Sequence, residues 1–166
     1  MKRLTSNWKW VVGLALVVAT GGGIATAADF VYPQSGRLTS NYYSSRPYGR
    51  HGALDIAGPN GTAITAARSG TCIFSGWSGG YGNLVIIRHR SGYTSYYAHL
   101  SRRDVSSGQA VGRRQRIGLE GSTGNSTGPH VHWEVRRYGT KQIVPGRVGN
   151  WVTRYNEVPY NYPGLD

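Results

Sequence analysis

Apolar residues along this chain come in short runs that Gly, Ser, Asn and Pro interrupt every several residues. Short runs with turn residues between them predict β-strands and no long helix. The clearest expected hairpin joins residues 84–89 to residues 93–100 through Arg90-Ser91-Gly92, a loop of hairpin length that contains Gly. Further strands are expected at 63–66, 72–77 and 130–137. The pattern therefore predicts an all-β fold, an antiparallel β sandwich or open barrel.

Two long loops are expected around one end of this sheet. Residues 41–52 and 120–129 show no strand periodicity, and loops of this length in a compact domain commonly carry function. We expect them to form a cleft. The tail at about 144–166, with three prolines and several aromatic residues, is expected to wrap over the sheet as packing.

Residues 1–27 have the features of an export signal. Three basic residues accompany an apolar run at 10–19, and Ala25-Thr26-Ala27 supplies the small residues of a cleavage site. Cleavage would leave residues 28–166 as a single domain, a length that supports one hydrophobic core. The alternative is an uncleaved anchor, because residues 10–28 carry no charge. In both cases we expect the domain outside the cytoplasm, and after cleavage we expect no stable membrane insertion.

The chain that remains after cleavage is strongly basic. Removing three signal cations from 19 Lys and Arg residues leaves 16, which against seven Asp and Glu give a net charge of +9. Outside a cell this charge favours adsorption to anionic polymers. Nucleic acid would also attract a basic, Tyr-rich chain, but the export signal argues against that partner. We expect a monomer.

The segment His51-Gly-Ala-Leu-Asp55 is the first pattern that points to chemistry, because it places an imidazole and a carboxylate four residues apart. Alone it is weak evidence. Asp55 could instead be the ion-pair partner of Arg46 or Arg50.

The segment His130-Val131-His132 strengthens the case for a metal site. Alternation along a strand places both rings on one face, about 6.5–7 Å apart. One ring can then bind a metal ion while the other reaches a group in its outer coordination sphere. With the first pattern this gives two nitrogens, one carboxylate oxygen and an open position for water, the arrangement of a catalytic zinc site. Copper, nickel or cobalt could use these ligands, but a redox-silent ion suits exported hydrolysis.

His99 is a candidate for moving protons. It follows Tyr93, Ser95 and Tyr97 at alternating positions, so we expect it on their face of the strand, with Leu100 opposite. A single His on a β face is more often a structural hydrogen-bonding residue. Beside water that a metal ion has made acidic, it could act in acid–base catalysis.

Four motifs together resemble the lysostaphin-type family of zinc metallopeptidases, which includes lysostaphin and LytM-like autolysins. They lie in order between residues 46 and 138: Arg46-Pro-Tyr-Gly-Arg-His-Gly-Ala-Leu-Asp55, Gly79-Gly-Tyr-Gly-Asn83, Tyr96-Tyr-Ala-His-Leu100 and Gly121-Ser-Thr-Gly-Asn-Ser-Thr-Gly-Pro-His-Val-His132. The resemblance implies a secreted zinc-dependent endopeptidase that hydrolyses peptide bonds in stem peptides or cross-bridges of bacterial peptidoglycan. The anionic polymers would then be those of the cell wall.

The resemblance also implies roles for single residues. His51, Asp55 and His132 correspond to the family's zinc ligands, with one Zn²⁺ per chain held in the cleft. His130 and His99 correspond to its unligated catalytic pair. His130 would take the proton of the attacking water and His99 would stabilise the oxyanion, although the two roles could be exchanged.

A family tyrosine that stabilises the transition state corresponds to Tyr43 or Tyr48, and the sequence does not decide between them. Ala53 and Arg114 occupy positions where the family commonly has Gly.

The alternative function is a non-catalytic peptidoglycan-binding or hydrolase-activator protein of the same fold. The presence of all five expected side chains favours the enzyme. A metal-free, basic polymer-binding module would leave the motif spacing unexplained. The resemblance covers both glycyl-glycine bridges and D-amino acid cross-links, so the sequence does not name the bond.

Overall fold

The computed structural model describes residues 30–47, 49–154, 156 and 158. These residues contain one 3₁₀ turn, η1 (Gly79–Tyr81), and no α-helix. The strands are β1 (Gly36–Ser40), β2 (Ser45–Arg46), β3 (Gly49–Arg50), β4 (Leu54–Ala57), β5 (Ala63–Thr65), β6 (Gly70–Trp77), β7 (Asn83–Arg88), β8 (Tyr93–Leu100), β9 (Arg102–Arg103), β10 (Ala110–Val111), β11 (Arg116–Leu119), β12 (Val131–Arg137), β13 (Thr140–Lys141) and β14 (Trp151–Val152).

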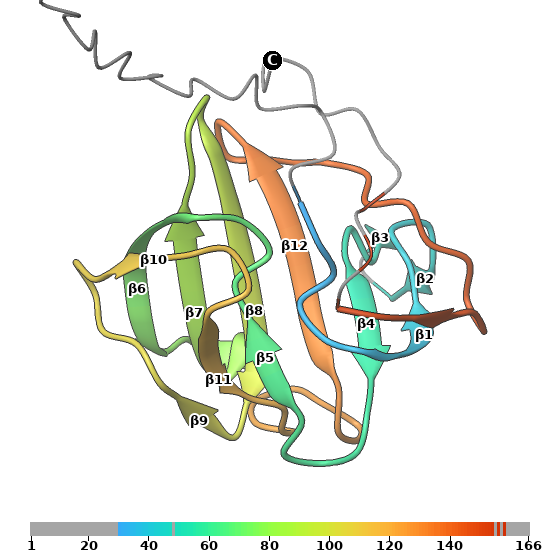
Figure 1. Cartoon of the computed structure of the whole chain (residues 1–166). Helices are drawn as coiled ribbons and strands as arrows, with labels where there is room; N and C mark the ends of the chain where they lie inside the picture. The colour runs from blue at the N-terminus through green and yellow to red at the C-terminus, as the bar shows by residue number, and fades with distance from the viewer. Residues whose placement is uncertain (1–29, 48, 155, 157, 159–166) are drawn as a thin grey trace, which may run out of the picture.

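The strands form one large antiparallel sheet and two small ones. The large sheet has the order β10-β6-β7-β8-β12-β4-β1-β14, with β13 paired to β12. The sheet β5-β11-β9 lies across it (Figure 1), and β2 pairs with β3 in a separate hairpin. The predicted all-β class is confirmed, and in the described residues the sheet stays open instead of closing into a barrel.

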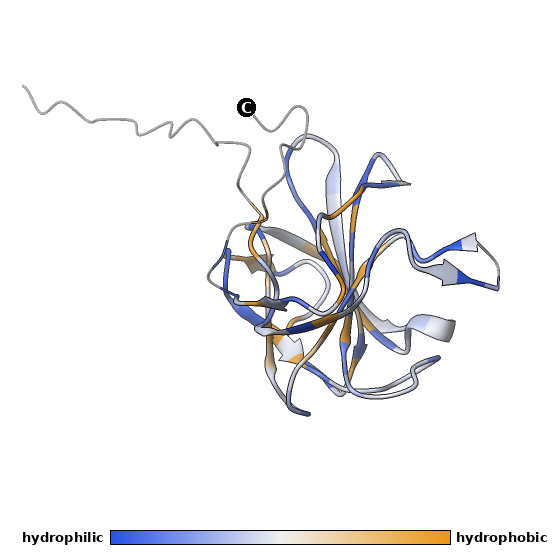
Figure 2. Cartoon of the chain, turned by 90° about the vertical axis from the view of Figure 1, so that its right-hand side faces the viewer, coloured by the Kyte–Doolittle hydropathy of each residue, from blue (hydrophilic) through white to orange (hydrophobic). Residues whose placement is uncertain are grey.

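Alternation along β12 gives the large sheet a core face and a polar face. Val131, Trp133 and Val135 are fully buried and belong to one apolar cluster with Ile64 of β5 and Ile117 of β11. Apolar segments accordingly lie in the interior (Figure 2). The residues between these core positions on β12 face the other side, where the polar groups of the sheet gather.

The expected hairpin is present as β7 and β8, and the other predicted strands appear as β5, β6 and β12. The segment 41–52 differs from expectation, because it contains the β2–β3 hairpin, which projects from the body of the domain (Figure 2). Strands of two residues are too short to show a hydrophobic period in the sequence.

The tail at about 144–166 is described only in part, and its three tyrosines, which were expected to pack over the sheet, lie outside the described residues. In its described part β14 pairs with β1, and Val144 and Val152 are buried, whereas the Trp151 side chain is 65% exposed. The expected signal at 1–27 and the end of the tail at 159–166 lie outside the described residues. No helix in the described ranges is long and apolar enough to span a bilayer.

Candidate metal centre

Strand register brings Asp55 and His132 together across 77 positions of sequence. Asp55 on β4 lies directly opposite His132 on β12 and, on its other side, opposite Ser40 on β1. Side chains that are paired in this way have Cβ atoms about 4.5–5.5 Å apart. The sheet therefore fixes both groups before any ligand is bound.

His51 reaches the same point through a turn that precedes β4. Gly52 has φ +68°, a left-handed conformation that reverses the chain direction, and a Cβ there would also meet the side chain of Lys141. Backbone hydrogen bonds from His51 N to Ser44 O (2.9 Å) and from Gly52 N to Tyr42 O (3.0 Å) hold the turn. As a result the two residues of the His-x-x-x-Asp pattern face each other.

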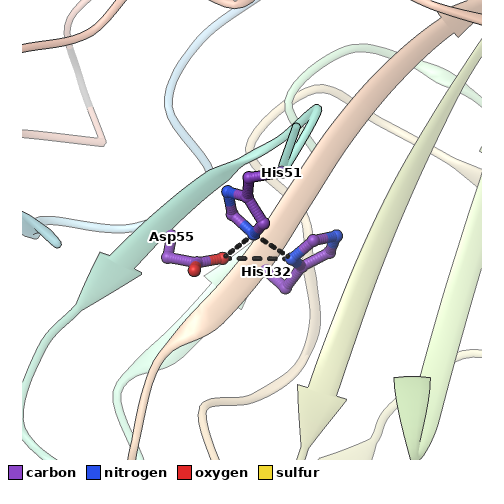
Figure 3. A group of neighbouring side chains, drawn as sticks. All are labelled: His51, Asp55 and His132. Atoms are coloured by element: carbon purple, nitrogen blue, oxygen red, sulfur yellow. Dashed lines mark hydrogen bonds and ion pairs between the residues drawn. The ribbon is translucent and has the colours of Figure 1, made fainter. Parts of the chain in front are cut away.

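Three ligand atoms converge on one point (Figure 3). His51 Nε2 lies 3.1 Å from Asp55 Oδ1, His132 Nδ1 lies 3.0 Å from the same oxygen, and the two nitrogens are 3.0 Å apart. Zn²⁺ with bonds of about 2.0–2.2 Å and tetrahedral angles needs ligand atoms roughly 3.3–3.5 Å apart. A small outward shift of each side chain would fit the ion.

In each ligand ring one nitrogen faces Asp55, the inner nitrogen, and the other faces away, the outer nitrogen. The partner of the outer nitrogen determines whether the inner nitrogen can bind a cation. His51 Nδ1 lies 3.1 Å from Ser40 Oγ and 3.3 Å from Asn41 O, and His132 Nε2 lies 2.9 Å from the carboxylate of Glu134. The Asn41 carbonyl and the Glu134 carboxylate can only accept, and the Ser40 hydroxyl can also accept, so neutral rings with protons on these outer nitrogens satisfy all three contacts. The inner nitrogens then present lone pairs to each other and to a carboxylate. This set of three acceptors needs a cation between them.

Burial and hydrogen bonding set the pKa values at the centre. Burial alone would raise the pKa of Asp55, but hydrogen bonds with His132 and His51 outweigh it and hold the pKa well below its usual range. Burial would lower the pKa of His132, but hydrogen bonds to Asp55 and Glu134 raise it. A proton on His132 can therefore take the place of a cation, so any metal ion that binds here would compete with protons.

Glu134 is a further candidate site residue that the sequence analysis missed. Its side chain is fully buried and it contacts His132, Lys141 Nζ (2.8 Å), Arg136 NH2 (2.6 Å) and the hydroxyl of Tyr81 (2.9 Å). Burial would raise its pKa, but hydrogen bonds with His132 and Lys141 lower it to about 2. The ionised carboxylate thus orients the His132 ring from behind, as outer-shell carboxylates do in metal proteins. Alternation from His132 to Glu134 was the signal that could have revealed it.

The centre opens into a cleft of about 480 Å³. Both expected loops contribute to it, and η1 supplies a third wall that the sequence analysis did not include. The lining residues are Arg46, Pro47, His51, Asp55, Gly80, Tyr81, His99, Asn125, Ser126, Thr127, His130 and His132.

His99 enters the cleft because of a β-bulge. Asn83 pairs with Leu100 and Val85 with Tyr97, so Ala98 and His99 together oppose the single residue Leu84. His99 has φ +62°, and its ring lies 4.9 Å from that of His130. The expected face was therefore wrong. The bulge breaks the alternation after Tyr97, which returns Leu100 to the core and turns His99 toward the polar side.

His130 and His99 use their Nδ1 atoms in the same way. His130 Nδ1 donates to Gly128 O and His99 Nδ1 donates to Thr123 O, both at 2.8 Å. Their Nε2 atoms are then acceptors in the neutral rings, and that of His130 lies 3.7 Å from Asp55 Oδ1. Burial lowers the pKa of His99 to about 4, so its ring is neutral at pH 7.

Two further pairs of candidates concern the transition-state tyrosine and the arginine partner of Asp55. Tyr43 is 53% exposed, lies under the guanidinium of Arg50 (5.4 Å) and does not line the cleft, while Tyr48 lies outside the described residues. Arg50 is thus not the partner of Asp55. Arg46 is, with NH2 3.0 Å from Asp55 Oδ2, so the ion pair and the metal-binding geometry coexist on the two oxygens of one carboxylate.

Comparison with known proteins agrees with this geometry. The family model described as Peptidase family M23 matches residues 49–145, a range that contains all five candidate site residues. This chain belongs to peptidase family M23. The predicted resemblance to the lysostaphin-type peptidases is thereby confirmed, since the M23 catalytic domain of lysostaphin from Staphylococcus simulans aligns with a TM-score of 0.57 at 31% identity, over 70% of this chain and 90% of that one.

Other M23 relatives differ in their described activities. The DD-carboxypeptidase/endopeptidase Mpg of Neisseria meningitidis is 47% identical over 89 residues, 54% of this chain and 20% of Mpg. The murein hydrolase activator NlpD of Salmonella dublin is 38% identical over 117 residues, 70% of this chain and 30% of NlpD. A zinc-containing peptidase from Vibrio cholerae has a TM-score of 0.64 at 31% identity, over 75% and 40% of the two chains. The match spans 20% of the length of Mpg and 30% of the length of NlpD, so this chain corresponds to less than a third of either relative.

Proposed function

We propose that this M23 chain is a secreted zinc endopeptidase that hydrolyses peptide bonds in bacterial peptidoglycan. One observation carries the proposal: two imidazole lone pairs and a carboxylate converge at the floor of a cleft that also contains two unligated histidines. Support comes from the relative named as a DD-carboxypeptidase/endopeptidase and from the zinc-containing peptidase of the same fold.

Zinc is the cation that suits this site. A set of two nitrogens and one oxygen with an open fourth position is typical of catalytic zinc. When bound by His51, Asp55 and His132, zinc would supply a Lewis acid that polarises the scissile carbonyl and makes water acidic near neutral pH. Glu134 and Asn41 hold the two rings in the tautomers that binding requires.

We assign the positioning and deprotonation of the attacking water to the side chains of His130 and His99. His130 accepts the proton of the attacking water at Nε2, which lies 3.7 Å from Asp55 Oδ1, and the ring then returns it to the leaving amine. His99 also presents an acceptor nitrogen. Its pKa of about 4 leaves Nε2 unprotonated at neutral pH, so His99 can accept a hydrogen bond from the attacking water but is too weak a base to hold that water's proton.

The second candidate function is activation of another hydrolase without catalysis. It has one specific support, the similarity to the activator NlpD. Against it stands the complete set of five side chains in one cleft. We further propose that residues 1–27 direct export, that residues 28–166 form the peptidase domain, and that the +9 charge of that part promotes adsorption to anionic wall polymers.

The test is to express the full chain, collect the exported protein, and measure both its zinc stoichiometry and the release of amino groups from purified cell walls. We expect one zinc per chain and steady release of amino groups. A protein without zinc would refute the metal site. A zinc-loaded protein that releases no amino groups, yet stimulates a separate wall hydrolase, would establish the activator function instead.

A further inference from the structure

Arg46 is the side chain of the cleft whose charge the mechanism does not use. It ends β2 and lines the cleft, and its NH2 group donates to Asp55 Oδ2 (3.0 Å) and to Ser40 Oγ (3.1 Å). The Arg46 side chain is nevertheless 48% exposed, in contrast to 7% for Asp55. Arg46 is thus anchored at one nitrogen and open to the cleft elsewhere.

The guanidinium has donors to spare. Arginine carries five N–H groups in a planar fork, and in the described residues the hydrogen bonds of this guanidinium come from NH2 alone. Among the described residues that line the cleft, Arg46 and Asp55 are the two with permanently charged side chains, and Asp55 is directed at the histidines. The free edge of Arg46 therefore makes the cleft attractive to an anion.

The position of this charge relates it to the reaction. The carboxyl group of Asp55 connects Arg46 to the ligand group, because Oδ1 lies beside His132 Nδ1 and Oδ2 accepts a hydrogen bond from Arg46. An anion on the free edge of the guanidinium would consequently lie in the same cleft as the reacting carbonyl, on the Arg46 side of the ligand group. Arginine binds carboxylates in bidentate, charge-assisted hydrogen bonds.

We propose that Arg46 binds a free carboxylate of the substrate beside the scissile amide. The inference rests on the proposed peptidase function and names its substrate class. Two kinds of substrate carry such a carboxylate. In one, a D-amino acid is linked directly to a diamino acid that has a free carboxylate of its own. In the other, the peptide chain ends with the residue next to the scissile bond. Glycyl-glycine bridges are neutral at this position. The geometry accordingly selects the first class over the second.

The test uses two synthetic stem-peptide dimers that differ in a single group, a carboxylate or a primary amide next to the scissile bond. The wild-type chain should cleave the carboxylate dimer with a kcat/KM about 10-fold to 100-fold higher, the range expected for a charge-assisted hydrogen bond. Arg46→Gln should reduce this ratio to near one. Arg46→Lys, which keeps the charge but not the fork, should retain part of it.

The matched control is Arg50→Gln, in the same hairpin. Arg50 stacks on Tyr43 and does not line the cleft, so its removal should leave the ratio unchanged. Zinc content measured for each variant shows whether loss of the Asp55 contact has disturbed the metal site. Equal cleavage of both dimers by the zinc-loaded wild-type chain, or an unchanged ratio in zinc-loaded Arg46→Gln, would overturn the inference and leave the peptidase function standing.

Failure of the peptidase function has a different signature. In that case neither dimer is hydrolysed, and calorimetric binding of the two dimers gives the contribution of Arg46. A Kd that is equal for the carboxylate and the amide would then overturn the inference as well.

Discussion

Replacement of Glu134 by Gln tests how the protein prepares His132 for metal binding. The substitution keeps the shape of the side chain but removes the anion that His132, Lys141 and Arg136 share. The amide oxygen of Gln can still accept from His132 Nε2. Its NH₂ group, however, must face one of two cations. Loss of an outer-shell carboxylate weakens metal binding by about 10-fold to 100-fold, or about 1.4–2.7 kcal/mol.

Competition for zinc with a chromogenic chelator measures this change directly, and circular dichroism shows whether the chain remains folded. Glu120→Gln is the matched control, because Glu120 is also fully buried but bonds to Gln34 and the backbone of Gly58 instead of a ligand histidine. A wild-type zinc affinity in Glu134→Gln would refute the orienting role. Equal weakening in Glu120→Gln would trace the effect to general destabilisation.

Three further predictions address catalysis and stability. His130→Ala should keep zinc but lose most wall hydrolysis, whereas His132→Ala should lose both; metal analysis beside the amino-group assay separates them, and wild-type hydrolysis by His130→Ala would eliminate it as the base. Burial lowers the pKa of His89 to about 4. Between pH 6.5 and pH 4 the unfolded chain therefore binds more protons than the folded chain. The free energy of unfolding consequently falls as the pH falls through this window, by up to about 3 kcal/mol. His89→Asn can still donate to Ser69 O. Its free energy of unfolding, measured by urea denaturation, should fall less between pH 7 and pH 4.5 than that of the wild-type chain, and an equal fall would contradict this. Arg114→Gly should stabilise the chain by about 1 kcal/mol, because Arg114 has φ +68°, whereas Arg113→Gly should destabilise it; thermal melts that reverse this order would refute the strain argument.

The sequence was sufficient for the parts of the molecule that follow from period and spacing. Two-residue alternation predicted β12 and the separation of Trp133 from His132, and extending it by one step would have included Glu134. The bulge at Ala98–His99 could not be predicted in this way, since no local pattern marks an extra residue whose effect depends on the pairing with β7. The contact of Arg46 with Asp55 was considered only as an alternative to metal binding, because spacing does not show that a carboxylate has two usable oxygens.

The contact between Lys141 and Glu134 has a practical consequence for amine chemistry. Lys141 is the only lysine after Lys9, so a chain cleaved after Ala27 carries a single side-chain amine. The Lys141 side chain is 35% exposed, and its amine contacts the Glu134 carboxylate behind His132. Acylating labels, amine-reactive surfaces and lysine cross-linkers would therefore react with the residue that supports Glu134 and His132, and attachment through an introduced cysteine or the chain terminus avoids this.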